Sequence, residues 1–192
     1  MIGNEYSNKT IKQNLIDGLS KKEFILSKFY TIVFFSLVAT ILLTLISLLI
    51  GLYYSSYNEI GIILSETEYL LGYFVKLVGF FSFCLFLGML AKRSAFALAF
   101  LFVDFILEWI IFGLIAWKSD TNIAEKIQNF FPLKSMYNLI KQPFQRIAMS
   151  KFPDKANLAY DYAVHWYEIV IVLAWTALFV FLSYRLLKKR DL

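Results

Sequence analysis

Residues 29–54 read FYTIVFFSLVATILLTLISLLIGLYY, and the run contains no charged side chain. The hydrocarbon core of a bilayer is about 30 Å thick, which a helix of about 20 apolar residues crosses. Because unpaired backbone groups are costly in lipid, a spanning segment of this kind is a helix and not an open strand. The stretch therefore predicts a transmembrane helix and an integral membrane protein.

The composition of the whole chain agrees with this interpretation. The 192 residues are 59% hydrophobic and 17% charged, whereas soluble domains are about 45–50% apolar and about 25% charged. One Cys and one His exclude a disulfide framework within the chain and a zinc site built from several such residues. The net charge of +5 is expected from basic flanks of membrane spans, and we expect no nucleic-acid partner.

Three further stretches are long and apolar enough to span. We expect one membrane domain, residues 1–192, with spans at about 29–54, 69–91, 94–117 and 167–187. Lys and Arg gather before the first span, at the turn 92–93 and after the last span, whereas the loop 55–68 carries only acidic charges. The positive-inside rule then places both termini in the cytoplasm. The predicted fold class is an all-α membrane protein of four transmembrane helices.

The loop 118–166 lies outside in this orientation, and its seven Lys and Arg residues are not explained by it. Two short amphipathic patterns occur in the loop, one around Ile123 and Ile127 and one after Pro132. Such segments suit the outer interface or a partial dip into it. We expect an outer amphipathic segment before the last span.

Residues 1–28 form a polar arm with its own pattern. Ile11, Leu15 and Leu19 recur every fourth residue, which predicts a short amphipathic helix that Gly18 ends. Ser20 and Glu23 have capping-box spacing, and so a second helix should start at Ser20 and run into the first span. Leu19 and Phe24 flank this box as a hydrophobic staple. The arm is either an interfacial anchor or a rigid projection for a cytoplasmic partner.

Three charges fall inside predicted spans, where each is costly. Lys76 lies about 10 Å and Glu108 about 13 Å from the outer ends of consecutive antiparallel helices, and so we expect these two to pair. Asp104 lies one turn from Glu108 on the same face. The group is either a structural ion pair or, in an alternative reading, the site of a proton-coupled carrier. A non-transporting membrane anchor or assembly protein is a further alternative.

The arm also resembles a known family. The residues EYSNKT at 5–10, NLIDGLSKKEF at 14–24 and then Lys28 are similar to the cytoplasmic segment of type 2 ABC exporter permeases. The spans that follow, the segment starting near 131–133 and the basic end KKRD at 188–191 match the layout of that family. The family normally has two membrane helices before this segment, and we expect this chain to lack them.

The resemblance implies the permease subunit of an ATP-driven ABC exporter in a bacterial plasma (inner) membrane. It implies a separate ABC ATPase subunit and a second permease copy, giving a homo- or heterodimer. The chain carries no G-x-x-x-x-G-K-[ST] sequence, so we expect no enzyme activity and no cofactor in it, with ATP and Mg on the partner ATPase. The arm would be the coupling helix. Its expected contact residues are Glu5, Thr10, Leu15, Gly18, Leu19, Ser20, Lys21, Lys22, Glu23 and Phe24.

Overall fold

The computed structural model describes residues 2–8, 10–54, 67–118, 121–141 and 163–189, and the regular structure in these ranges is all helical. Four of the helices are long and apolar enough to cross a membrane. They are α3 (Lys21–Tyr54), α5 (Glu68–Ala91), α6 (Ser94–Lys118) and α10 (Trp166–Lys188). The prediction of an all-α membrane protein with four spans is confirmed.

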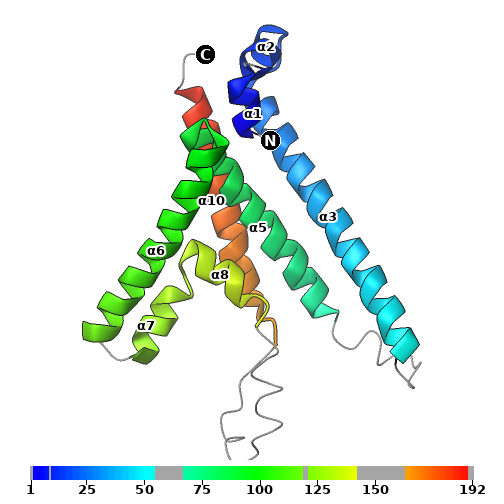
Figure 1. The fold of residues 1–192 in the computed structure, drawn as a ribbon, viewed down its shortest axis with the longest axis vertical. Coiled ribbons are helices and arrows are strands. Elements are labelled where there is room, and N and C mark those ends of the chain that lie inside the picture. The colour runs from blue at the N-terminus through cyan, green and yellow to red at the C-terminus, as the bar shows by residue number, and fades with distance from the viewer. Residues whose placement is uncertain (1, 9, 55–66, 119–120, 142–162, 190–192) are drawn as a thin grey trace, which may run out of the picture.

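In the ranges that the structure describes, four short helices accompany the spans. They are α1 (Ile2–Ser7), α2 (Thr10–Ile16), α7 (Thr121–Gln128) and α8 (Pro132–Asn138). The two ends of the chain lie at the same end of the bundle as the turn between α5 and α6, with α1 and α2 beside them (Figure 1). Helix α1 was not expected from the sequence, because six residues are too few to show a helical period.

Helix α5 forms the centre of the bundle and packs closely against α10. A Cβ atom added to Gly79 would come within 2.7 Å of the Val172 side chain, so this contact depends on the absence of a side chain. Aromatic rings continue the interface, with the Phe83 and Phe86 rings of α5 4.7 Å and 5.7 Å from the Phe179 ring of α10 between centroids. The α5–α10 pair is the core on which the other helices rest.

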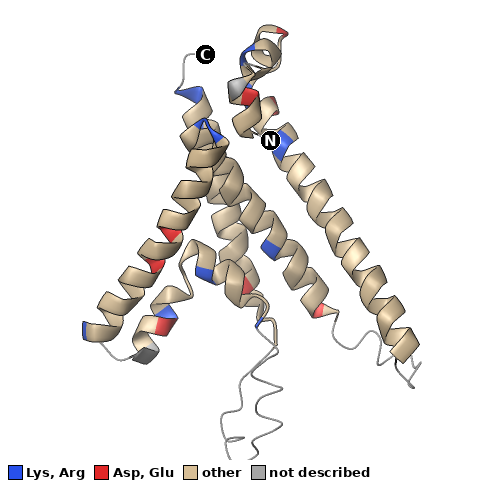
Figure 2. Cartoon of the chain, in the orientation of Figure 1, with Lys and Arg blue, Asp and Glu red and all other residues tan. Residues whose placement is uncertain are grey.

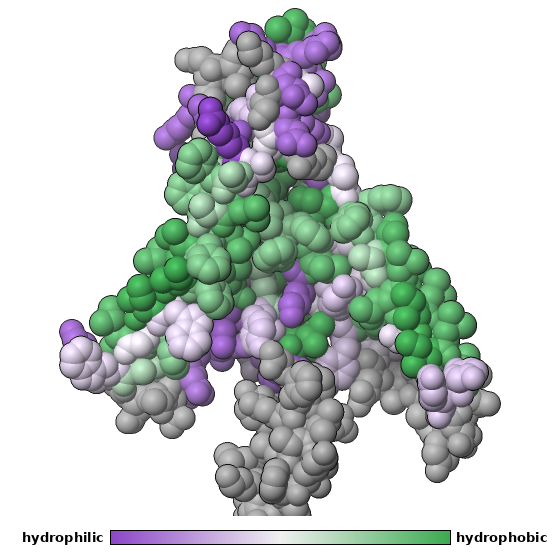
Figure 3. Space-filling model, viewed as in Figure 1, coloured by the Kyte–Doolittle hydropathy of each residue, from purple (hydrophilic) through white to green (hydrophobic). Residues whose placement is uncertain are grey.

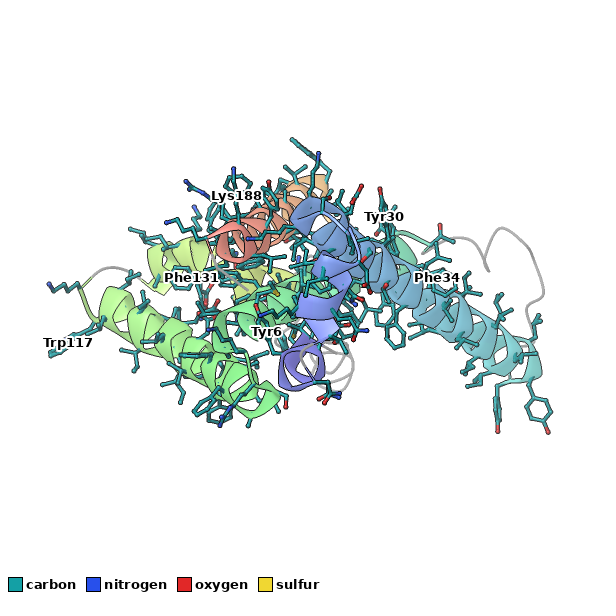
Figure 4. The ribbon with its side chains drawn as sticks, turned by 90° about the horizontal axis from the view of Figure 1, so that it is seen from above. Tyr6, Tyr30, Phe34, Trp117, Phe131 and Lys188 are labelled. Atoms are coloured by element: carbon teal, nitrogen blue, oxygen red, sulfur yellow. The ribbon has the colours of Figure 1, made fainter. Side chains whose placement is uncertain are left out.

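Helices α3 and α6 diverge from this core. Seen from above, they extend in opposite directions, with Phe34 on one and Trp117 at the end of the other (Figure 4). Phe34 is 69% exposed and Trp117 is 88% exposed, and apolar side chains cover both diverging helices (Figure 3). Such surfaces suit hydrocarbon, in which a helix satisfies its own backbone groups.

Helices α7 and α8 turn back toward the bundle after α6. Helix α7 runs beside α6, and α8 contacts α5 and α10 (Figure 1). Met136 and Leu139 are buried, and the indole N–H of Trp175 donates to the carbonyl of Phe130 at 2.9 Å. The two predicted amphipathic segments are therefore helical. Residues 142–162 of the predicted outer loop and most of the loop 55–68 fall outside the described ranges.

Candidate functional site

The N-terminal arm is anchored to the bundle by an apolar cluster. Ile11, Phe24 and Ile25 are each 1% exposed. They share this cluster with Ile2, Leu85, Met89 and Leu187, from α1, α5 and α10. Ile11, the first residue of the apolar stripe predicted for the arm, therefore packs against protein. This packing fixes the arm relative to three of the spans.

Polar contacts tie the same elements together. Lys28 on α3 forms an ion pair with Glu5 on α1. The Thr10 hydroxyl donates to the Glu5 carbonyl at 3.3 Å, and the Lys21 ammonium donates to the Lys188 carbonyl at 3.4 Å. Lys188 is the last residue of α10, and so the arm is linked to the first and the last span.

The corner between α2 and α3 has the predicted local structure. Gly18 has φ of +102°, a conformation that side-chain-bearing residues avoid. The Glu23 backbone N–H donates to the Ser20 hydroxyl at 3.2 Å, and the Ser20 N–H donates to the Glu23 carboxylate at 2.9 Å. The capping box is confirmed. Glu23 precedes the apolar stretch that begins at residue 29. Hydrogen bonds from the Ser20 hydroxyl and backbone N–H hold the pKa of the Glu23 carboxyl below its ordinary value.

The structure divides the ten predicted contact residues into anchors and an exposed tip. Phe24 is buried, while Glu5, Thr10, Leu15 and Lys21 are partly buried. The exposed set comprises Gly18, Leu19, Ser20, Lys22 and Glu23. A staple between Leu19 and Phe24 stays a prediction.

Ile16 was not among the predicted contact residues. Its side chain is 73% exposed because it sits beside the stripe that begins with the buried Ile11. A large apolar residue at the polar end of the molecule is a candidate contact for a partner. Its position next to the stripe was the signal in the sequence that pointed to it.

The structure corrects the predicted pairing of Lys76 with Glu108. The Glu108 carboxylate accepts from the backbone N–H groups of Leu133 at 2.8 Å and of Lys134 at 3.1 Å. These donors open helix α8, whose first backbone N–H groups have no partner within the helix. Pro132 at the start of α8 is the sequence signal for this helix end, because proline is favoured at the first helical position.

Lys76 has a different neighbour. Its ammonium lies 5.5 Å from the centre of the Tyr137 ring, which also has Lys134 at 5.4 Å. The prediction assumed that the two antiparallel helices stay side by side along their whole length, whereas α6 diverges from α5 and α8 lies between their outer parts (Figure 2). Asp104 remains one turn from Glu108 on α6 and is half-buried. Its Oδ2 atom is buried and has no hydrogen-bond partner among the described residues.

These helices define the class as a multi-pass membrane protein without strands in its described residues. The sequence profile described as "ABC-2 family transporter protein" matches residues 1–192. The chain belongs to this family, and it is a permease of an ABC transporter. Permeases of this kind are transport subunits that work, in general, with an ABC ATPase. Comparisons with curated proteins and with solved structures give no match.

Proposed function

We propose that this chain is the membrane subunit of an ATP-driven exporter and that a separate ATPase subunit docks on its N-terminal arm. The observation that carries the proposal is the continuity between an exposed tip and a buried anchor. Leu19 and Ile16 present apolar surface at the tip, while Phe24, a few residues further, is 1% exposed in the cluster shared with α5 and α10. A partner that moves the tip therefore moves the bundle.

The chemistry of the tip suits a groove on a folded protein. Short helices commonly bind by placing a few apolar side chains in such a groove, with charged residues at the rim. Lys22 and Glu23 are exposed beside Leu19 and supply that rim. ATP and Mg would stay on the ATPase, and the arm would receive its motion without any covalent chemistry.

The orientation and the assembly belong to the same proposal. The arm, the turn Lys92–Arg93 and the basic end of α10 all lie at one end of the bundle (Figure 2). The positive-inside rule assigns this end to the cytoplasm, and the membrane proposed for a permease of this family is the bacterial inner membrane. Two copies, identical or related, would line a shared path, and the exposed apolar faces of α3 and α6 are available to a second copy as well as to lipid.

Co-purification with the cognate ATPase tests the proposal. The paired change Ile16→Ala and Leu19→Ala removes the apolar surface of the tip. We expect the affinity for the ATPase, and with it the amount retained, to fall about tenfold or more, which corresponds to about 1.4 kcal/mol of binding free energy. Ile127→Ala is the matched control, because Ile127 is 41% exposed on α7 at the opposite end. Undiminished retention of the ATPase by the tip variant would contradict the docking surface.

A second variant separates docking from transmission. Lys28→Gln removes the ion pair with Glu5 and leaves the tip intact. We expect this variant to retain the ATPase but to export less substrate per ATP hydrolysed. An unchanged ratio of export to hydrolysis would show that the ion pair takes no part in transmission.

The proton-coupled alternative rests on Asp104 and Glu108. The two backbone contacts of Glu108 with α8 favour a structural role for this carboxylate. We expect export by the Asp104→Asn variant to depend on ATP hydrolysis and to stay unchanged when a proton gradient is applied. This result would support the ATP-driven proposal.

A further inference from the structure

The bundle contains an apolar cavity that the proposed docking surface does not use. Its volume is about 470 Å³, and it lies on the side of α5 that faces α3 and α6. Ile2 of α1, Phe35 of α3 and Leu98 of α6 line it together with Cys84 and Gly88 of α5. Pockets for small ligands commonly have volumes of about 300–1,000 Å³. The cavity is therefore large enough for a ligand.

The chemistry of the wall selects an aliphatic ligand. Among the described residues that line the cavity none is charged, and the hydroxyls come from Thr31 and Ser94 alone. The Thr31 hydroxyl donates to the carbonyl of Ser27 at 2.9 Å within its own helix. The wall thus offers dispersion contacts along its length and little to orient a polar group.

The surroundings of the cavity point to lipid as the source of the ligand. Its side walls are the two diverging spans, and both expose apolar side chains next to it, with Phe34 69% and Leu98 68% exposed. A membrane supplies acyl chains and not water at this depth. An empty cavity would forfeit the contacts that a chain makes with its wall.

Two basic residues stand where the headgroup of such a lipid would lie. Lys92 and Arg93 form the exposed turn between α5 and α6, and the next residue, Ser94, lines the cavity. The lining residues of α5 extend from Phe81 to Gly88, which is about 5–15 Å from the end of that helix. An acyl chain would thus enter the cavity from a phosphate group at the turn.

We propose that one acyl chain of an anionic phospholipid from the leaflet at the Lys92–Arg93 turn occupies this cavity, with its phosphate bound by that turn. The site does not depend on the ATPase. It does reach the arm, because Ile2 packs against Gly88 beside the cavity, with a Cβ added to Gly88 3.2 Å from the Ile2 Cβ atom. The lipid would hold α1, α3, α5 and α6 in the arrangement of the structure.

Photocrosslinking of the full-length chain in nanodiscs tests this proposal. The probe is a phosphatidylglycerol with a diazirine in its acyl chain, and the same-chain phosphatidylcholine is its zwitterionic counterpart. We expect the phosphatidylglycerol probe to label the peptide containing Cys84 several-fold more than phosphatidylcholine does. Labelling around Leu45 and Leu49 of α3, which are 51% and 69% exposed, reports bulk lipid and should be equal for both probes.

Two sets of variants complete the test. The double variant Lys92→Asn, Arg93→Gln should abolish the preference for phosphatidylglycerol; asparagine is chosen because Lys92 has φ of +60°, which asparagine tolerates. Leu98→Trp should fill the cavity and reduce labelling at Cys84, whereas Leu107→Trp, on the same helix and outside the cavity lining, should not. Equal labelling at Cys84 by both probes, or a preference that survives the double variant, would overturn the proposal.

Discussion

Glu108 provides the sharpest test of the packing described above. Its carboxylate accepts two backbone N–H groups of α8 at 2.8 and 3.1 Å. Hydrogen bonds to charged groups contribute about 1.5–3 kcal/mol each in soluble proteins, whereas side-chain bonds between membrane helices average nearer to about 0.6 kcal/mol. For the loss of both bonds in Glu108→Ala, we expect the free energy of unfolding to fall by about 2–4 kcal/mol, between these limits.

Glu108→Gln keeps one acceptor oxygen but brings an amide that faces the second N–H group. We expect it to lose about half as much stability as the alanine variant. Asp104→Asn is the matched control, one turn away on the same helix. It should not lower the stability, because the Asp104 Oδ2 atom is buried without a hydrogen-bond partner among the described residues and so no hydrogen bond of this atom is lost. Reversible unfolding in mixed micelles of a mild and a denaturing detergent measures these differences.

A double-mutant cycle with Lys76→Gln distinguishes this reasoning from the ion pair predicted from the sequence. Because Lys76 also contacts α8 through the Tyr137 ring, the cycle is carried out in a Tyr137→Leu background, which removes this shared contact. If Glu108 acts on α8 and not on Lys76, the effects of Lys76→Gln and Glu108→Gln in that background should add within about 0.5 kcal/mol. A coupling energy well above 1 kcal/mol between the two positions would refute the assignment of Glu108 to α8.

Three further outcomes follow from the arm. Gly3→Ala should lower stability by about 1–3 kcal/mol, because its Cβ would lie 2.7 Å from the Ser94 nitrogen. Gly51→Ala, with open space around it, should not lower it in the same unfolding assay. Gly18→Ala should strain the corner by about 1–2 kcal/mol, and hydrogen exchange of α2 should speed up, whereas Gly18→Asn should be milder. The Glu23 carboxyl has its pKa below the ordinary 4.5, so the stabilisation that it gives to the start of α3 is complete above pH 4.5 and is lost as the pH falls below that value. Hydrogen exchange at residues 20–24 should become faster as this stabilisation is lost. The Ser20→Ala variant should show little of this pH dependence.

The sequence predicted those features that depend on neighbours along the chain. The spans follow from uninterrupted apolar runs, and the capping box follows from the spacing of Ser20 and Glu23, since each is fixed by local backbone geometry. Gly18 was recognised at the corner for the same reason, because a helix end followed by a second helix needs a residue that tolerates positive φ.

The features that were missed depend on helices that meet far apart in the sequence. Lys76 was the wrong partner for Glu108, because the depth of a residue along a helix does not show whether two helices diverge. In addition, the start of α8 supplies backbone N–H donors that bind Glu108 instead. The packing of α1 was missed because its contacts involve glycines at positions 3 and 88, which leave no periodic trace in six residues. The amphipathic pattern of the arm predicts that Ile11 is buried, but it does not distinguish burial against protein from burial in lipid.

Helix α3 has one further consequence. It is 34 residues long, or about 50 Å, and its buried residues are Phe24, Ile25 and Ser36, all in its first half. A rigid rod held near one end magnifies rotation at that end: a turn of about 5° at the arm displaces Tyr54 by about 4 Å across a helix of this length. Small movements on one membrane face thus become displacements of atomic size on the other.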